Sequence, residues 1–113
     1  IGLMCHQATR QYRYGVASKL FDYMAAGLAI VGGQADFDRE FAPEGTVKLY
    51  VDETSPSQYA AAISSLLDDQ ELRRQMGKNA RRLFEEKYTA EAQSAGLLDF
   101  YEQQLARASS RAA

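Results

Sequence analysis

One segment near the start of the chain restricts the fold more than any other, because a helical stretch there ends at a glycine and leads straight into an apolar run. Residues 19–26 favour a helix, since leucine, methionine and alanine are strong helix formers. Gly27 is the residue type that most readily adopts the left-handed conformation in which many helices end. Residues 28–31 are all apolar and are followed by two glycines. A helix that leads into a strand apolar on both faces is typical of a parallel sheet covered by helices, so the sequence predicts an α/β fold.

The predicted helix, residues 16–26, has a polar side. Helical periodicity places Asp22 opposite the apolar residues and on the same side as Gly15 and Ser18. This polar stripe leads back to the start of the helix, where free backbone N–H groups and the helix dipole favour a phosphate or another anion. We therefore interpret the stripe as a ligand-binding face. The alternative is that Asp22 simply pairs with Lys19 on an exposed surface.

The composition is that of an ordinary globular domain and argues against several classes of protein. The chain has 113 residues, 46% of them hydrophobic and 25% charged, with a net charge of −2. It contains no apolar run long enough to cross a membrane, and its near-neutral charge gives no reason to bind nucleic acid. The single cysteine, Cys5, argues against a zinc site and favours a reducing compartment, so we expect a cytoplasmic protein.

The loop expected over residues 6–15 is cationic. Arg10, Arg13 and Lys19 all precede Asp22, which is the first acidic residue of the chain. A basic loop of this kind is either a solvated surface segment or a segment that meets an anion. The glycine and the helix start that follow favour the second interpretation.

The remaining pattern predicts two more strands and several helices. Thr89, Ser55 with Gln58, and Asp68 with Glu71 carry the side chains of helix N-caps and capping boxes. We expect the last helix over residues 89–107, with Leu97, Leu98, Tyr101 and Leu105 on its inner face, and a tail over residues 108–113. The other expected elements are strands at 1–5, 28–31 and 47–51 and a short helix within 34–41 that ends before Pro43, with Phe37 in the core.

Strands that alternate with helices in this order form half of a doubly wound unit, which normally holds more strands than these three. The sequence therefore predicts a partial Rossmann-like parallel sheet followed by C-terminal helices, as part of a larger domain. Ligands of such sheets bind beyond the carboxyl ends of the strands. We expect Cys5, His6, Gly32 and Gly33, which end the first two strands, to line a cleft.

Three ordered motifs give the chain a resemblance to a known family. Residues 18–31 (SKLFDYMAAGLAIV), residues 71–88 (ELRRQMGKNARRLFEEKY) and the Thr-Ala-Glu that follows resemble the end of a GT-B glycosyltransferase. They are most similar to the retaining family 4, also called glycosyl transferases group 1. The resemblance extends from the first residue to about Leu105. It implies that residues 1–113 are the C-terminal portion of a domain that binds a nucleoside-diphosphate sugar.

The resemblance also implies partners and roles. It implies an acceptor-binding N-terminal domain outside this chain, no metal and no cofactor besides the nucleotide-sugar substrate, and peripheral membrane contact, if any, through the rest of the enzyme. A glycosyltransferase cleft closes between two domains, so the chain alone is expected to be inactive. The residues implied in donor binding are Tyr14, Gly15, Val16, Ser18, Lys19 and Asp22, with His6 and Arg13 as further candidate contacts.

Individual positions depart from the family pattern. The family glutamate that holds the ribose hydroxyl groups falls on Asp22, which keeps the charge but is one methylene shorter. The family's other acidic position falls on Tyr14, which is uncharged at neutral pH, so no catalytic residue is assigned. Gly15 and Val16 stand where backbone N–H groups approach the donor, and Lys19 keeps the family lysine. These departures leave two alternatives open, another GT-B enzyme such as a nucleotide-sugar epimerase, and a non-catalytic docking module.

Overall fold

Three short parallel strands form the centre of the fold. The structure is a computed structural model and describes residues 1–7 and 9–113. The strands lie side by side in the order β1-β2-β3, and each neighbouring pair is parallel. Their bounds are β1 (Gly2–Met4), β2 (Ile30–Gly32) and β3 (Lys48–Tyr50). The predicted α/β class with a partial parallel sheet is therefore confirmed.

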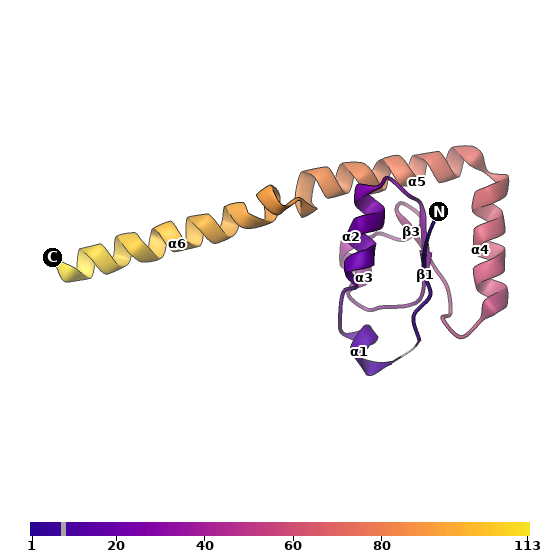
Figure 1. The fold of residues 1–113 in the computed structure, drawn as a ribbon, viewed down its shortest axis with the longest axis horizontal. Helices are drawn as coiled ribbons and strands as arrows, with labels where there is room; N and C mark the ends of the chain where they lie inside the picture. Colours follow the sequence, from indigo (N-terminus) through magenta and orange to yellow (C-terminus); the bar gives the residue numbers. More distant parts are fainter. Residues whose placement is uncertain (8) are drawn as a thin grey trace.

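Helices cover both faces of this sheet (Figure 1). On one side lies α2 (Ser18–Ala25) and on the other lies α4 (Pro56–Asp68). Successive residues of a strand point to opposite faces, so Ile30 joins the core beneath α2 while Val31 joins the core beneath α4. The first core contains Met4, Leu20, Met24, Ile30, Ala42, Val47 and Ala80. The second contains Ala29, Val31, Val51, Leu66 and Met76.

β2 differs from its predicted position, because it begins at Ile30 and includes Gly32. Gly32 pairs with Met4 on one side and Tyr50 on the other. A Cβ atom at Gly32 would lie 2.7 Å from Cβ of Met4 and 3.0 Å from Cε of Lys48. Gly32 ends the strand, as the sequence predicts, and its lack of a side chain also lets the neighbouring side chains approach.

The mid-helix glycine of α5 (Gln70–Leu83) has a packing function. Gly27 ends α2 with φ of 70°, as its residue type predicts. A Cβ atom at Gly77 would lie 2.3 Å from the carbonyl oxygen of Gly27. The two backbones can therefore meet only because Gly77 has no side chain, and α5 crosses the end of α2 at this point.

The expected helix caps are present with small shifts. Ser55 Oγ accepts a hydrogen bond from the Gln58 backbone N–H at 3.3 Å, and Thr89 Oγ1 accepts one from Ala92 at 3.1 Å. The cap of α5 is Asp69 rather than the expected Asp68. The helix α2 begins at Ser18, later than predicted, with Ala17 as its N-cap.

Two predictions about the loops need correction. The segment expected as a loop over residues 6–15 contains a short helix, α1 (Arg10–Arg13), which Thr9 caps. The short helix expected within residues 34–41 is present as α3 (Asp38–Phe41) and ends before Pro43. Phe37 lies before it and is 43% exposed, so the prediction that it belongs to the core is wrong.

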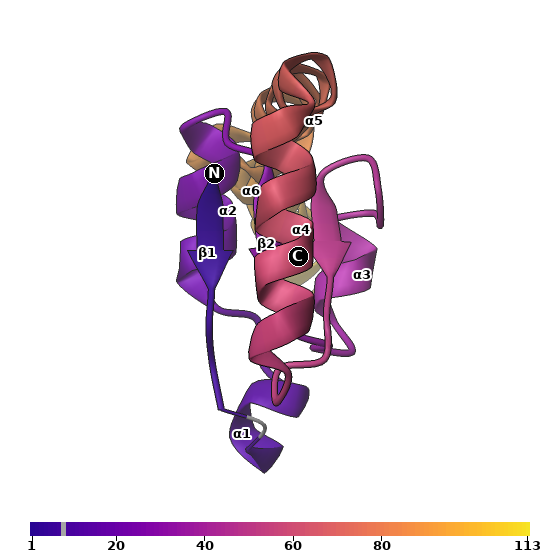
Figure 2. The ribbon, with the colours of Figure 1, turned by 90° about the vertical axis from the view of Figure 1, so that its right-hand side faces the viewer.

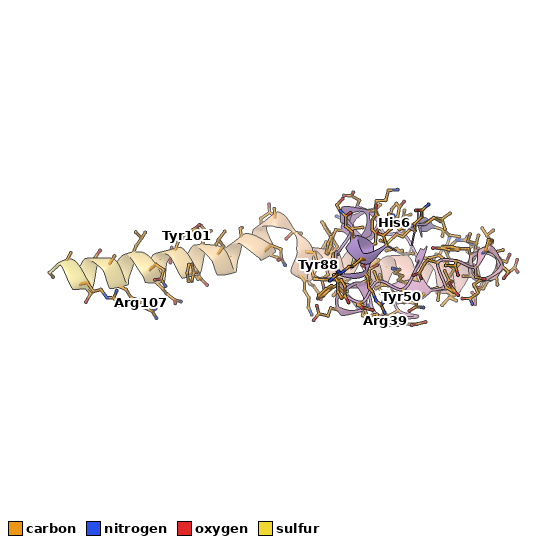
Figure 3. All side chains as sticks on the ribbon, turned by 90° about the horizontal axis from the view of Figure 1, so that it is seen from below. His6, Arg39, Tyr50, Tyr88, Tyr101 and Arg107 are labelled. Atoms are coloured by element: carbon orange, nitrogen blue, oxygen red, sulfur yellow. The ribbon has the colours of Figure 1, made fainter. Side chains whose placement is uncertain are left out.

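The last helix does not pack on the sheet. After the π-helical turn η1 (Phe84–Tyr88), α6 (Ala90–Ala112) extends away from the body, and the molecule is 66 Å long (Figure 1). Tyr101 and Arg107 lie far along this helix, away from Tyr50 (Figure 3). The expected inner face is exposed, and the expected tail continues the helix as far as Ala112. Among the helices of the described residues, none has the length and apolarity needed to cross a membrane.

Candidate functional site

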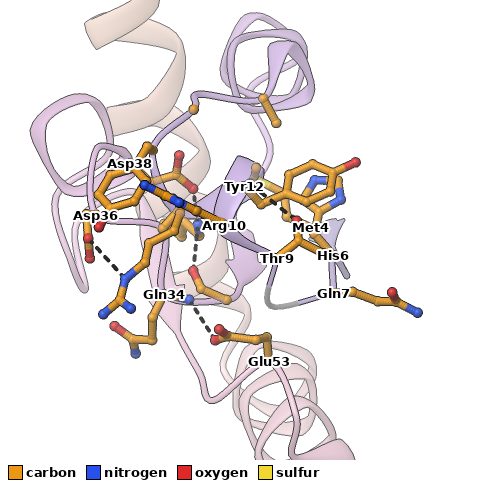
Figure 4. A pocket seen from close by; sticks show the side chains of 17 residues that line it. Met4, His6, Gln7, Thr9, Arg10, Tyr12, Gln34, Asp36, Asp38 and Glu53 are labelled. Carbon is orange, nitrogen blue, oxygen red and sulfur yellow. Dashed lines mark hydrogen bonds and ion pairs between the residues drawn. The ribbon is translucent and has the colours of Figure 1, made fainter.

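A cavity of about 580 Å³ opens at the edge of the sheet where the strands end. His6 follows β1, Gly33 and Gln34 follow β2, and Glu53 follows β3, and all four line it (Figure 4). β1 points toward α1, so the α1 segment closes this end of the molecule (Figure 2). The cavity lies at the edge predicted for a ligand, although Cys5 and Gly32 do not line it. Its volume is typical of small-molecule sites.

The α1 segment forms one wall of the cavity. The ring of His6 stacks on that of Tyr12, with centroids 4.5 Å apart and an interplanar angle of 7°. Nε of Arg13 lies 3.4 Å from Oδ2 of Asp36, and these side chains are 65% and 59% exposed. An ion pair this exposed contributes less than about 1 kcal/mol. Arg13 can therefore exchange Asp36 for an anionic ligand at little cost.

A buried ion pair lies at the base of the cavity. Nζ of Lys48 is 2.5 Å from Oδ2 of Asp38 and donates a second hydrogen bond to the Gly33 carbonyl oxygen at 3.2 Å. Each of the two charged residues is 1% exposed. Burial lowers the pKa of Lys48 from its ordinary value, and the hydrogen bond that Lys48 donates to Asp38 opposes this effect.

Sequence reasoning missed this ion pair. The available signal was Lys48 itself, which is a charged residue among the apolar and aromatic residues of the strand predicted at 47–51. Lys48 Nζ also lies 4.4 Å from the centroid of the Tyr50 ring. Burial raises the pKa of Tyr50 well above its ordinary value, and the nearby Asp38 carboxylate adds to the effect.

Opposite charges balance around the cavity. Its cationic side chains are Arg10, Arg13 and Lys48, and its carboxylates are Asp36, Asp38 and Glu53. Glu53 Oε2 accepts a hydrogen bond from the Gln34 backbone N–H at 3.2 Å. Exposed arginines at the rim and the buried carboxylate of Asp38 suit a ligand that carries both an anionic group and hydrogen-bond donors.

The structure brings together only part of the predicted site. Tyr14, Gly15, His6 and Arg13 line the cavity, together with Ala17, the N-cap of α2. Val16, Ser18, Lys19 and Asp22 do not line it. Asp22 lies farther along α2 with its side chain exposed to solvent. The role of each of these residues in donor binding stays a prediction. In the part of the chain that the structure describes, no three His, Cys, Asp or Glu residues are grouped to hold a metal ion.

This architecture defines the class of protein. The fold is similar to that of sucrose-phosphate synthase from Thermosynechococcus elongatus, with a TM-score of 0.73 and 22% identity, over 81% of this chain and 23% of that one. It is also similar to the C-terminal domain of a glycosyl transferase group 1 family protein from Francisella tularensis, with a TM-score of 0.62 and 23% identity, over 70% of this chain and 40% of that one. The chain has the fold of the C-terminal part of a GT-B glycosyltransferase.

Sequence comparison identifies the family. The glycosyl transferase-like family matches residues 1–99, and the chain belongs to it. Spore coat protein SA of Bacillus subtilis is 32% identical over 93 residues, which are 81% of this chain and 25% of that protein. The chain thus spans about a quarter of the length of this curated relative. The resemblance found in the motifs is confirmed.

Proposed function

We propose that this chain is the donor-binding portion of a retaining glycosyltransferase, which transfers a sugar from a nucleoside diphosphate to an acceptor held by another domain. The observation that carries the proposal is the cavity at the carboxyl edge of the parallel sheet, with arginines at its rim and the start of α2 in its wall. Membership of the glycosyl transferase-like family supports the same reaction class.

In this proposal the diphosphate lies at the start of α2. Ala17 makes no side-chain cap hydrogen bond, so the first backbone N–H groups of α2 can donate to phosphate oxygens. A helix N-terminus stabilises a nearby anion by about 0.3–1 kcal/mol at exposed sites. Arg10 and Arg13 supply charge-assisted hydrogen bonds, which strengthen as the leaving diphosphate gains charge in the transition state.

The nucleoside would then extend from the cavity over the exposed face of α2. Ser18 and Lys19 lie in its first turn, and the Asp22 carboxylate follows one turn later with two oxygens that can accept ribose hydroxyl groups. Val16 and Gly15 would offer backbone N–H groups to the donor. Tyr14 would contact the sugar through its phenol instead of a carboxylate.

The wider assignment follows from the same chemistry. Helix amides and basic side chains neutralise the diphosphate, so the proposed enzyme uses no metal and no organic cofactor. The acceptor site belongs to a domain outside this chain, and the isolated chain does not turn over. A cytoplasmic location is part of the proposal, with any membrane contact peripheral and made by the rest of the enzyme.

A thermal-shift measurement on the full-length protein that contains this chain tests the proposal. Uridine, guanosine and adenosine diphosphates are added separately, and one of them should raise the Tm. Saturation at about a hundredfold excess over Kd stabilises a protein by about 2.7 kcal/mol. No shift with any of the three would contradict the proposal and favour the docking module.

Variants test the residue assignment separately. Asp22→Ala should reduce the shift, whereas Asp99→Ala, which removes an exposed carboxylate of α6, should leave it unchanged. If Asp22→Ala keeps the full shift, the ribose assignment is wrong although nucleotide binding itself stands.

A further inference from the structure

Two buried polar atoms without a hydrogen-bond partner lie in residues of the same cavity. Within residues 1–7 and 9–113, Oδ1 of Asp38 and Nε2 of His6 are the buried side-chain atoms that lack a partner. Both residues line the cavity at the carboxyl edge of the sheet (Figure 4). Buried polar groups in folded proteins are nearly always hydrogen-bonded, so each such exception calls for a physical explanation. A single molecule bound in this cavity would supply both partners at once.

The side chain of Asp38 is held in a fixed position. Its Oδ2 bonds to Lys48 Nζ at 2.5 Å, and Lys48 is itself fixed by the Gly33 carbonyl oxygen and the ring of Tyr50. The side chain of Asp38 is almost fully buried. Oδ1 therefore keeps its lone pairs available in a preorganised acceptor, and no side-chain entropy is lost when it binds a donor.

The charges around Asp38 select the kind of donor. An ionised carboxylate accepts hydrogen bonds and donates none. Lys48 already compensates its charge, so the pair has no net charge to attract a cation. A phosphate group is disfavoured here, since both Asp38 and Glu53 are acidic. A neutral hydroxyl group satisfies Oδ1 without adding charge to the buried pair.

We infer that Asp38 is a sugar-binding residue, whose Oδ1 accepts a hydrogen bond from a hydroxyl group of the donor's hexose, and that Nε2 of His6 makes a second hydrogen bond to the same sugar. This inference rests on the proposed function and deepens it. The diphosphate lies at the Arg10 and Arg13 rim, and the hexose points inward to the buried carboxylate of Asp38. Asp38 thereby becomes a determinant of which sugar is accepted.

The sugar reaches Asp38 when neighbouring side chains move aside, because Oδ1 and Nε2 are covered in the absence of a ligand. Arg10, Tyr12 and Arg13 of α1 are exposed and form one wall of the cavity, where the Tyr12 ring stacks on His6. Their displacement exposes little buried surface, so it costs little free energy. A site built around such a hydrogen bond rejects analogues that lack the hydroxyl group, because the buried acceptor is then left unpaired.

The test compares nucleoside diphosphates with their hexose conjugates in the full-length protein. Isothermal titration calorimetry measures Kd for uridine, guanosine and adenosine diphosphates and for the corresponding diphosphate hexoses. Asp38→Asn should weaken binding of the hexose conjugate by about tenfold, as expected for one hydrogen bond to a charged group, and change binding of the nucleoside diphosphate by less than about twofold. Deoxy analogues locate the hydroxyl group, since one of them should bind the wild-type protein and the variant equally.

Control variants separate this effect from a loss of structure. Asp52→Asn removes an exposed carboxylate just after β3, outside the cavity lining, and should leave both affinities unchanged. Where Asp38→Asn alone does not fold, the double variant Asp38→Asn with Lys48→Met removes both buried charges together and should give the same selective loss.

The outcomes distinguish the inference from the function on which it rests. If the wild-type protein binds neither the diphosphates nor their conjugates, the proposed function fails and the inference fails with it. If the wild-type protein binds both kinds of ligand but Asp38→Asn weakens both equally or neither, the sugar contact is overturned while donor binding stands.

Discussion

At the scale of single residues, the buried pair of Asp38 and Lys48 is the most consequential feature. An ion pair that leaves water gains little net free energy, because desolvation offsets the attraction between the charges. Its two members are nevertheless strongly interdependent, since either one alone would be a buried charge without compensation. The pair therefore contributes little stability over an apolar substitute, but it fixes a carboxylate oxygen at the cavity.

This interdependence gives a stability prediction. Lys48→Met should lower the free energy of unfolding by about 3–5 kcal/mol, because it leaves Asp38 buried and unpaired. The double variant Asp38→Asn with Lys48→Met should recover most of this loss. Urea denaturation of both variants measures the difference. Equal losses in the single and double variants would mean that the lysine acts by packing and not by its charge.

The raised pKa of Tyr50 should make the free energy of unfolding depend on pH. Its ordinary pKa is 10.0, and burial raises the pKa in the folded protein. Above pH 10 the unfolded chain releases this proton while the folded chain retains it, so stability falls as pH rises toward the folded-state pKa.

Tyr50→Phe should flatten this decline. It should also cost about 1 kcal/mol at neutral pH, because the phenol donates a 2.7 Å hydrogen bond to the Ala42 carbonyl oxygen. Denaturation at pH 8 to 11 checks both effects, and an unchanged decline would exclude Tyr50 as its source.

At the scale of elements, the crossing of α2 and α5 depends on two glycines for different reasons. Gly27 adopts a positive φ to end α2, whereas Gly77 leaves room for the Gly27 carbonyl oxygen. The crossing joins the helix that begins at the cavity to the helix that contributes Met76 and Ala80 to the two cores. A change at this crossing should therefore affect the whole body.

Gly77→Ala should destabilise the fold although alanine is the better helix former. The added Cβ would lie 2.3 Å from a backbone oxygen, so the helices must separate, at a cost of about 1–3 kcal/mol. Gly96→Ala in α6 is the matched control, because nothing lies within 4 Å of its added Cβ. The control should not lower the free energy of unfolding. Chemical denaturation compares the two variants, and equal effects would contradict the close helix crossing.

Local signals explain which elements could be predicted from the sequence. Caps such as Ser55 and Thr89 and the stop at Gly27 depend on a few neighbouring residues, so they were predicted correctly. The cavity edge followed from the strand order. The Asp38–Lys48 pair could not be predicted, because it joins residues of α3 and β3 whose contact depends on the tertiary fold. For the same reason the sequence named Asp22 but could not show that it lies outside the cavity lining.

At the scale of the whole molecule, α6 is set apart from the body. Periodicity predicted an apolar face for this helix correctly but not what the face would contact. Its large apolar residues are Leu97, Leu98, Phe100, Tyr101 and Leu105, and each is more than half exposed. The stability of the body therefore depends on the two cores that flank the sheet.

Matched leucine substitutions test this division. Leu66→Ala removes a fully buried side chain from the core beneath α4 and should cost about 2–5 kcal/mol. Leu105→Ala should change the free energy of unfolding by no more than about 0.5 kcal/mol, because the Leu105 side chain is 68% exposed. Denaturation of the 113-residue chain compares them. A comparable loss from Leu105→Ala would show that α6 packs against the body or another copy in solution.

The central claim is that the cavity at the carboxyl edge of the sheet holds a nucleotide sugar, and hydrogen exchange tests it most directly. Amide exchange of the full-length protein is measured by mass spectrometry with and without a saturating nucleoside-diphosphate hexose. The account predicts slower exchange in the segments around His6, Gly15 and Gly33, which line the cavity. Unchanged exchange in all three segments with every donor, or protection confined to the distant helix α5, would contradict it.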